Sequence, residues 1–269
     1  MRFVLVFAAM LAGCSSQPPP RATSAHPTIV SLNPCTDAIL AEVAQPVQIL
    51  ALSHYSQDSQ ASSMDVATAR KFAVTGGTVE EILALKPEVV VAGSFMPPAT
   101  RNALSDLGIR VETFGIASTI AESDAQIRTL ARIAGHPAAG DALVERIDTA
   151  VSDARTNAPP LSAVLWQPDG IVPGEGALVS DLMRRAGFAS HSAARGLKQA
   201  DFLSLEQMLA DPPQVLLLAG QERSQQHPAL ARLRATHRAK FDASLLYCGG
   251  PTIIRAVERL KAIRAQVAA

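Results

Sequence analysis

Residues 78–93 read "TVEEILALKPEVVVAG", and residues 204–220 read "SLEQMLADPPQVLLLAG". Each stretch predicts a capped amphipathic helix, a proline that ends it and a continuous apolar strand. The two copies share a glutamate at their third position, a proline near the helix end and a closing Ala-Gly. Chance similarity between two amphipathic units is the alternative, but the shared residues favour related units. We therefore expect two copies of one α/β arrangement.

Strands and helices alternate on both sides of this repeat. Apolar runs predict strands at 28–32, 47–53, 88–94 and 110–115 in the first half, and at 162–166, 214–220 and 243–247 in the second. Helical patterns separate these runs. Continuous apolar strands between amphipathic helices are typical of parallel sheets that are covered on both faces. The predicted fold class is therefore α/β, with two parallel-sheet lobes.

The middle of the chain differs, because residues 119–157 show a helical pattern that is broken only at "GHP" (Gly135–Pro137). The part after this break predicts one long α-helix that joins the lobes. We therefore divide the folded chain into an N-terminal α/β lobe (28–136), an inter-lobe helix (137–157) and a C-terminal α/β lobe (158–269).

The N-terminus carries an export signal. "MRFVLVFAAMLAGCSS" has one basic residue, a short apolar run and small residues before Cys14, which resembles a bacterial lipobox. We expect residues 1–13 to be a lipoprotein signal peptide and Cys14 to carry the lipid that anchors the protein to a membrane. A plain secretory peptide with an incidental cysteine is the alternative. Residues 14–27 are rich in Pro and Ser, and we expect a disordered tether there.

Composition narrows the classes of function. Lys plus Arg and Asp plus Glu both total 24, which argues against a nucleic-acid-binding surface or a polybasic membrane patch. The chain lacks the motifs G-x-x-x-x-G-K-[ST], H-E-x-x-H and G-x-S-x-G, and its six histidines are scattered. No pattern places a base beside a nucleophile. We therefore expect a protein that is not an enzyme, with no catalytic residue and no cofactor.

Both repeat helices begin with a capping-box pattern, T-x-x-E at 78–81 and S-x-x-Q at 204–207. The box accounts for the first and fourth residues of each pattern. It does not account for Glu80 and Glu206, which occupy the same place in the two copies. One interpretation is that each carboxylate complements the helix dipole. The other is that the two carboxylates form a paired docking surface, one on each lobe.

The chain resembles the cobalamin/ferric-siderophore class of bacterial ABC-transporter substrate-binding proteins. Four stretches carry the resemblance, in this order: "IVSLNPCTDAILAEVA", "GGTVEEILALKPEVVVAG", "VPGEGALVSDLMRRAGF" and "SLEQMLADPPQVLLLAG". The resemblance implies a bilobal periplasmic protein, a monomer, with its ligand in a cleft between the lobes. It also implies the permease and ATPase subunits of an importer as partners. In this family a glutamate on each lobe docks onto permease arginines, and the matching residues here are Glu80 and Glu206.

The cleft is expected where strand ends and the following loops from both lobes converge. Tyr55 aligns with an aromatic cleft position of cobalamin binders. Trp166 is assigned to the cleft, and a place in the core at the end of its strand is the alternative. The predicted ligand-binding residues are Asn33, Pro34, Cys35, Thr36, Tyr55, Gly77, Phe95, Trp166, Gly174, Tyr247 and Cys248.

The resemblance implies a large metal complex as the ligand, either a corrinoid such as cobalamin or a ferric siderophore. Small residues at 75–77 replace aromatics that are typical of cobalamin pockets, and no evident Arg/Lys cluster suits an anionic catecholate siderophore. These departures favour a corrinoid or another large, near-neutral metal complex. A haem-binding protein of the same fold is one alternative. A Zn²⁺- or Mn²⁺-binding protein is another, but only His54 and Asp37 lie at predicted strand ends as ligands, so no metal site is predicted.

Two cysteines remain once Cys14 carries lipid. Cys35 follows the first predicted strand, and Cys248 lies in a comparable turn before the last helix. An exported protein favours a disulfide between them. A bond across the cleft would obstruct a large ligand, so we prefer two free thiols that face the cleft.

Overall fold

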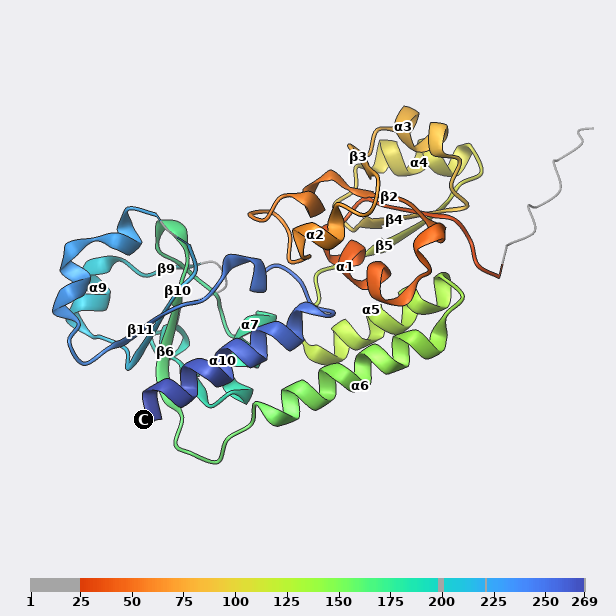
Figure 1. Ribbon diagram of the computed structural model, residues 1–269. Coiled ribbons are helices and arrows are strands. Elements are labelled where there is room, and N and C mark those ends of the chain that lie inside the picture. Colours follow the sequence, from red (N-terminus) through yellow and green to blue (C-terminus); the bar gives the residue numbers. More distant parts are fainter. Residues whose placement is uncertain (1–24, 198–200, 221, 269) are drawn as a thin grey trace, which may run out of the picture.

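The computed structural model describes residues 25–197, 201–220 and 222–268. Two α/β lobes lie next to each other, and long helices run along one side of both (Figure 1). The predicted α/β fold with parallel sheets in two lobes is confirmed. The predicted signal peptide, the lipid on Cys14 and most of the tether lie outside the described residues. Within the described ranges, no helix is both long and apolar enough to cross a membrane.

The N-terminal lobe is built on a five-stranded sheet in the order β3-β2-β1-β4-β5, with all neighbours parallel. The chain leaves β1 to one side and later returns to its other side at β4. The loops after β1 and β4 therefore diverge and leave a crevice at the carboxyl ends of the strands. The strands are β1 (Ile29–Ser31), β2 (Ile49–Ser53), β3 (Val74–Thr75), β4 (Val89–Gly93) and β5 (Arg110–Phe114).

Helices cover both faces of this sheet, which explains its continuous apolar strands. On one face, Val30 and Val90 pack with α3 (Val79–Leu85) and α4 (Pro98–Asp106). The other face belongs to a larger core that includes buried residues of α1 and α5. These helices are α1 (Pro34–Val43) and α5 (Ile120–Ile133), and the short α2 (Val66–Ala69) lies in the loop before β3.

Helices α5 and α6 (Pro137–Asp153) form an antiparallel pair that connects the lobes (Figure 1). Gly135, with φ 81°, makes the tight turn between them. The C-terminal helix α10 (Thr252–Ala268) packs along α6. Buried residues of α5, α6 and α10 form one hydrophobic cluster with residues of both sheets. The lobes therefore share a continuous core along this helical side.

The C-terminal lobe has a four-stranded parallel sheet in the order β11-β10-β6-β8 and a small antiparallel pair, β7 with β9. Its strands are β6 (Leu161–Trp166), β7 (Ile171–Val172), β8 (Phe188–Ser190), β9 (Asp201–Phe202), β10 (Val215–Leu218) and β11 (His237–Lys240). Its helices are α7 (Leu178–Arg185), α8 (His191–Ala194) and α9 (Leu205–Ala210).

The strand predicted at 243–247 was wrong. Residues Ala243–Leu245 form the 3-10 helix η6, and the strand of this region is β11. β11 reads H-R-A-K and buries only Ala239, because it lies at the edge of the sheet. An edge strand of this kind carries no apolar run that a sequence pattern could detect.

The two repeat units adopt the same order of helix and strand, α3–β4 and α9–β10. At α9 the predicted capping box is complete, with reciprocal hydrogen bonds between Ser204 and Gln207. At α3 only half of it forms, because the carboxylate of Glu81 accepts hydrogen bonds from Thr75 Oγ1 (2.7 Å) and Gly77 N–H (3.1 Å) instead. β3 ends at Thr75 and thus offers the carboxylate a second set of donors.

Candidate ligand-binding site

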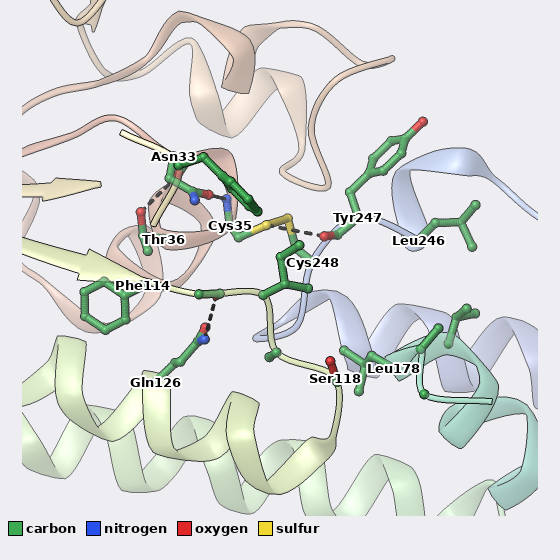
Figure 2. Close-up of a pocket in the computed structure, with 17 residues that line it drawn as sticks. Asn33, Cys35, Thr36, Phe114, Ser118, Gln126, Leu178, Leu246, Tyr247 and Cys248 are labelled. Carbon is green, nitrogen blue, oxygen red and sulfur yellow. Dashed lines mark hydrogen bonds between the residues drawn. A yellow bond between two sulfur atoms is a disulfide. The ribbon is translucent and has the colours of Figure 1, made fainter. Parts of the chain in front are cut away.

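A cavity of about 480 Å³ lies between the lobes (Figure 2). The N-terminal lobe, the C-terminal lobe and helix α5 all contribute to its wall, and every lining residue is uncharged. Its volume is in the range of pockets that bury small ligands. The wall consists of Asn33, Cys35, Thr36, Phe95, Phe114–Ser118, Gln126, Gly176–Val179 and Leu246–Cys248.

The first turn of α1 forms one part of this wall. The side chain of Asn33 caps the helix by accepting a hydrogen bond from Cys35 N–H at 2.8 Å. Pro34 occupies the first turn, where a backbone N–H has no acceptor within the helix, so the missing N–H of proline breaks no hydrogen bond. Thr36 Oγ1 lies 2.9 Å from the carbonyl oxygen of Asn33 and 2.8 Å from Ser31 Oγ. The helix start is therefore held rigidly at the carboxyl end of β1.

Cys35 and Cys248 form a disulfide whose Cα atoms are 5.1 Å apart, so the preference for free thiols was wrong. The turn before α10 approaches α1 closely, because Gly250 has no side chain: a Cβ there would lie 2.6 Å from Ile39 Cγ1. Gly250 N–H also donates to Ser123 Oγ of α5 at 2.8 Å. Both cysteines line the cavity, so the bond is part of its surface, where it joins the first turn of α1 to the turn before α10 (Figure 2).

Aromatic rings from both lobes are exposed near the site. Phe95 follows β4 and is 81% exposed, while Tyr247 precedes the disulfide and is 47% exposed; both line the cavity. The Tyr247 ring points away from helix α5 (Figure 2). Tyr55 is also exposed, outside the cavity wall, and its ring lies against that of His54, with centroids 4.0 Å apart and an angle of 36° between the ring planes.

Besides Pro34 and Tyr55, three more predicted ligand residues lie outside the cavity wall. Trp166 is a core residue of the C-terminal lobe, only 2% exposed, and its Nε1–H donates to the carbonyl oxygen of Leu203 at 2.9 Å. Its assignment to the cleft was wrong, since the strand end turns this side chain inward. Gly77 lies in the turn before α3, where its φ of 84° suits glycine, and its Cα faces the side chain of Leu32. Gly174 is buried, and the residues after it form the wall instead.

Sequence reasoning missed the segment Phe114–Ser118 and Gln126. The segment begins at the last residue of β5, a strand whose end was predicted at residue 115, so the strand-end rule could have found it. Gln126 lies within α5, where no sequence pattern distinguishes it from other polar helix residues. Its Nε2 donates to the carbonyl oxygen of Gly115 at 2.9 Å, which ties the segment to the helix.

The family described as periplasmic binding protein matches residues 29–241. The chain belongs to this family. Periplasmic binding proteins bind solutes outside the cytoplasm, serve the permease and ATPase subunits of ABC importers and are not enzymes. The expectations of a solute-binding role, a periplasmic location and no enzymatic activity are therefore confirmed. No curated protein matches the sequence.

Solved periplasmic binding proteins share the fold. The heme-binding protein RhuT from Roseiflexus sp. RS-1, in apo form, is 19% identical over 91% of this chain and 100% of its own, with a TM-score of 0.72. The vitamin B12 binding protein BtuF of Vibrio cholerae is 20% identical over 90% and 97%, with a TM-score of 0.67. The heme-binding protein HutB of Vibrio cholerae is 17% identical over 89% and 99%, with a TM-score of 0.72.

The side chains considered for a bare metal ion are used otherwise in this binding protein. His54 Nδ1 lies 3.3 Å from the carbonyl oxygen of Thr75, and Asp37 is fully buried. In the described part of the chain, no three His, Cys, Asp or Glu side chains gather closely enough to hold a metal ion.

Asp37 connects α1 of the binding protein to the loop after β2. Its Oδ2 accepts hydrogen bonds from Ser53 N–H (2.9 Å) and Ser56 Oγ (2.6 Å), on either side of His54 and Tyr55. Its Oδ1 is buried without a hydrogen-bond partner among the described residues. Burial raises the pKa of Asp37 from its usual value of 3.8 to about 7, against the lowering effect of the serines and the Ser53 amide.

The raised pKa of Asp37 has a consequence for stability. Between pH 3.8 and about 7 the folded protein retains a proton that the unfolded chain releases, so this group makes the free energy of unfolding fall as pH rises through that window. We expect Asp37→Asn to remove that slope and to stabilise the protein at pH 8 by about 1–3 kcal/mol. Urea unfolding of both proteins at several pH values measures the difference. A difference that does not change with pH would contradict the raised pKa.

Proposed function

We propose that this periplasmic binding protein captures a large, near-neutral metal complex of the corrinoid or haem type between its lobes. The observation that carries the proposal is the uncharged inter-lobe cavity, whose lining residues include an exposed aromatic residue from each lobe, Phe95 and Tyr247. Flat apolar surfaces of a macrocycle pack well against such rings. A ferric catecholate siderophore is less well supported, because no Arg or Lys lines the cavity.

The named ligands of similar structures agree with this class. RhuT and HutB are heme-binding proteins, and BtuF binds vitamin B12. Heme and vitamin B12 are both metal complexes of large macrocycles. A Zn²⁺ or Mn²⁺ binding protein is disfavoured by the scarcity of converging ligands, since such ions need three or four.

Delivery to the importer is proposed to use Glu80 and Glu206. Both are exposed in the first turn of their helices, α3 and α9. The Glu80 side chain makes no hydrogen bond or ion pair with any described residue. The backbone amide of Glu206 lowers the pKa of its own carboxyl group, with a further contribution from Ser204, which keeps it ionised. Two exposed carboxylates of this kind suit charge-assisted pairing with permease arginines.

Attachment to the membrane is proposed to occur through lipid on Cys14, after removal of residues 1–13, with the binding protein acting as a monomer. The supporting observation is the pattern of small residues before that cysteine. Mass spectrometry of the protein purified from membranes would detect the lipid.

A ligand screen tests the proposed function. Cyanocobalamin, dicyanocobinamide, hemin and ferric siderophores are added to the protein, and both thermal unfolding and the emission of Trp166 are recorded. Haem and corrinoids absorb near tryptophan emission, so binding quenches the single, buried Trp166. A ligand at 100 times its Kd is expected to stabilise the protein by about 2.7 kcal/mol.

Variants locate the site within the same screen. Phe95→Ala and Tyr247→Ala are each expected to weaken binding about tenfold. Phe202→Ala is the matched control, because Phe202 is 59% exposed but lies on β9, outside the inter-lobe cavity. No response to any metal complex, or tight stoichiometric binding of Zn²⁺ alone, would overturn the proposal.

A further inference from the structure

The disulfide between Cys35 and Cys248 lies within the surface of the cavity, and it links the two lobes. Cys35 belongs to the first turn of α1, and Cys248 belongs to the turn before α10, 213 residues later in the sequence. Both residues line the cavity. The bond is therefore part of the surface that a ligand would contact, in addition to any contribution to stability.

On the side of the C-terminal lobe, the disulfide holds Tyr247. The carbonyl oxygen of Tyr247 lies 3.4 Å from Cys35 Sγ, and the exposed ring of Tyr247 projects from this turn away from helix α5 (Figure 2). The turn continues into Gly249 and Gly250, two residues that leave the backbone free to adopt many conformations. The far end of the turn is held by hydrogen bonds from Gly250 N–H to Ser123 Oγ and from Ile253 N–H to the carbonyl oxygen of Gly250. Its near end is held by Leu245 and Leu246, which pack in the hydrophobic core. Between these two anchors, the covalent bond at Cys248 ties Tyr247 to the first turn of α1 in the N-terminal lobe.

On the side of the N-terminal lobe, the same bond is connected to Phe95. Asn33 caps Cys35 N–H through its Oδ1, and its amide group packs on Gly93, where a Cβ would lie 2.8 Å from Asn33 Nδ2. Gly93 is the last residue of β4, and Phe95 follows it with its ring 81% exposed. A short path of contacts thus runs from Tyr247 through the disulfide and Asn33 to Gly93, two residues before Phe95.

We propose that the Cys35–Cys248 disulfide determines the ligand specificity of the cavity by presetting the position of Tyr247 relative to Phe95. This inference rests on the proposed function. Two rings at a fixed spacing admit a ligand of one thickness and disfavour thicker or thinner ones, whereas a mobile turn adapts to several. A ring that is already ordered also loses less conformational entropy when a ligand binds.

The test compares ligand affinities with and without the bond. Kd values for cyanocobalamin, dicyanocobinamide and hemin are measured by Trp166 quenching for the oxidised protein, for the protein reduced with a phosphine, and for Cys35→Ser/Cys248→Ser. We expect the best ligand to bind about tenfold more weakly without the bond, as when one large ring must be ordered on binding. We also expect the ratio between the best and the second-best Kd to shrink. Reoxidation should restore both values in the reduced protein and neither in the double variant.

A matched control separates specificity from stability. Arg146→Ala removes the exposed ion pair between α6 and Glu42 of α1, outside the cavity wall, and should leave the ratio of Kd values unchanged. Equal Kd values and ratios for the oxidised, reduced and double-serine proteins would overturn the inference while leaving the proposed function intact. Tighter binding after reduction would also overturn it. Failure of the oxidised protein to bind any of the three complexes would instead overturn the proposed function.

Discussion

Uptake through the cognate importer is expected to fall on the order of 100-fold or more when Glu80 and Glu206 are both replaced by lysine, while ligand affinity stays unchanged. Each carboxylate stands exposed in the first turn of a repeat helix, one on each lobe. Reversal removes two attractive charge pairs with permease arginines and replaces them with repulsion. Neither residue lines the inter-lobe cavity, so binding itself should not respond.

The measurement is transport of the ligand identified in the screen, in cells or in proteoliposomes that contain the importer. Glu145→Lys/Glu258→Lys is a matched control, because it reverses two exposed acids on α6 and α10 and changes the net charge equally. Single variants are expected to retain part of the transport, since one pair remains. Normal uptake by the Glu80→Lys/Glu206→Lys protein would contradict the assignment of these residues to permease docking. Complementarity to the helix dipole would then remain as the explanation of both glutamates.

Loss of the Cys35–Cys248 disulfide is expected to lower the free energy of unfolding by about 3–5 kcal/mol. The bond closes a loop between residues 213 apart in sequence, so it restricts the unfolded chain strongly. It also links α1 of the N-terminal lobe covalently to the turn before α10. For a chain of this size, such a change corresponds to a decrease in Tm of roughly 10 °C.

Thermal unfolding of the oxidised protein, the reduced protein and Cys35→Ser/Cys248→Ser measures this effect. The reductant should not change the Tm of the double variant, which controls for effects on the solvent or on Cys14. Alkylation of the unreduced protein followed by mass spectrometry establishes the starting state. The same Tm for the oxidised and reduced proteins would show that the shared helical core alone holds the lobes together.

Local patterns in the sequence were sufficient for the two lobes and most of their elements. Apolar runs with the periods of strands and helices predicted β1, β2, β4, β5, β6 and β10, and the repeat related α3–β4 to α9–β10. Residues 33–36 were assigned to the site because they follow a buried parallel strand, and Asn33, Cys35 and Thr36 do line the cavity. These inferences succeeded because burial on both faces of a parallel sheet leaves a strong local signature.

Tertiary contacts decided the rest. Trp166 lies at a predicted strand end, yet it is buried because Leu203, 37 residues later, supplies an acceptor for its N–H. β11 lacks an apolar run because its position at the sheet edge requires only one buried residue. Cys35 and Cys248 pair because Gly250 lets the last turn approach α1. The sequence determines which segments become strands and helices, since periodicity is local, whereas the direction of each side chain and the partner of each cysteine depend on segments that only folding brings together.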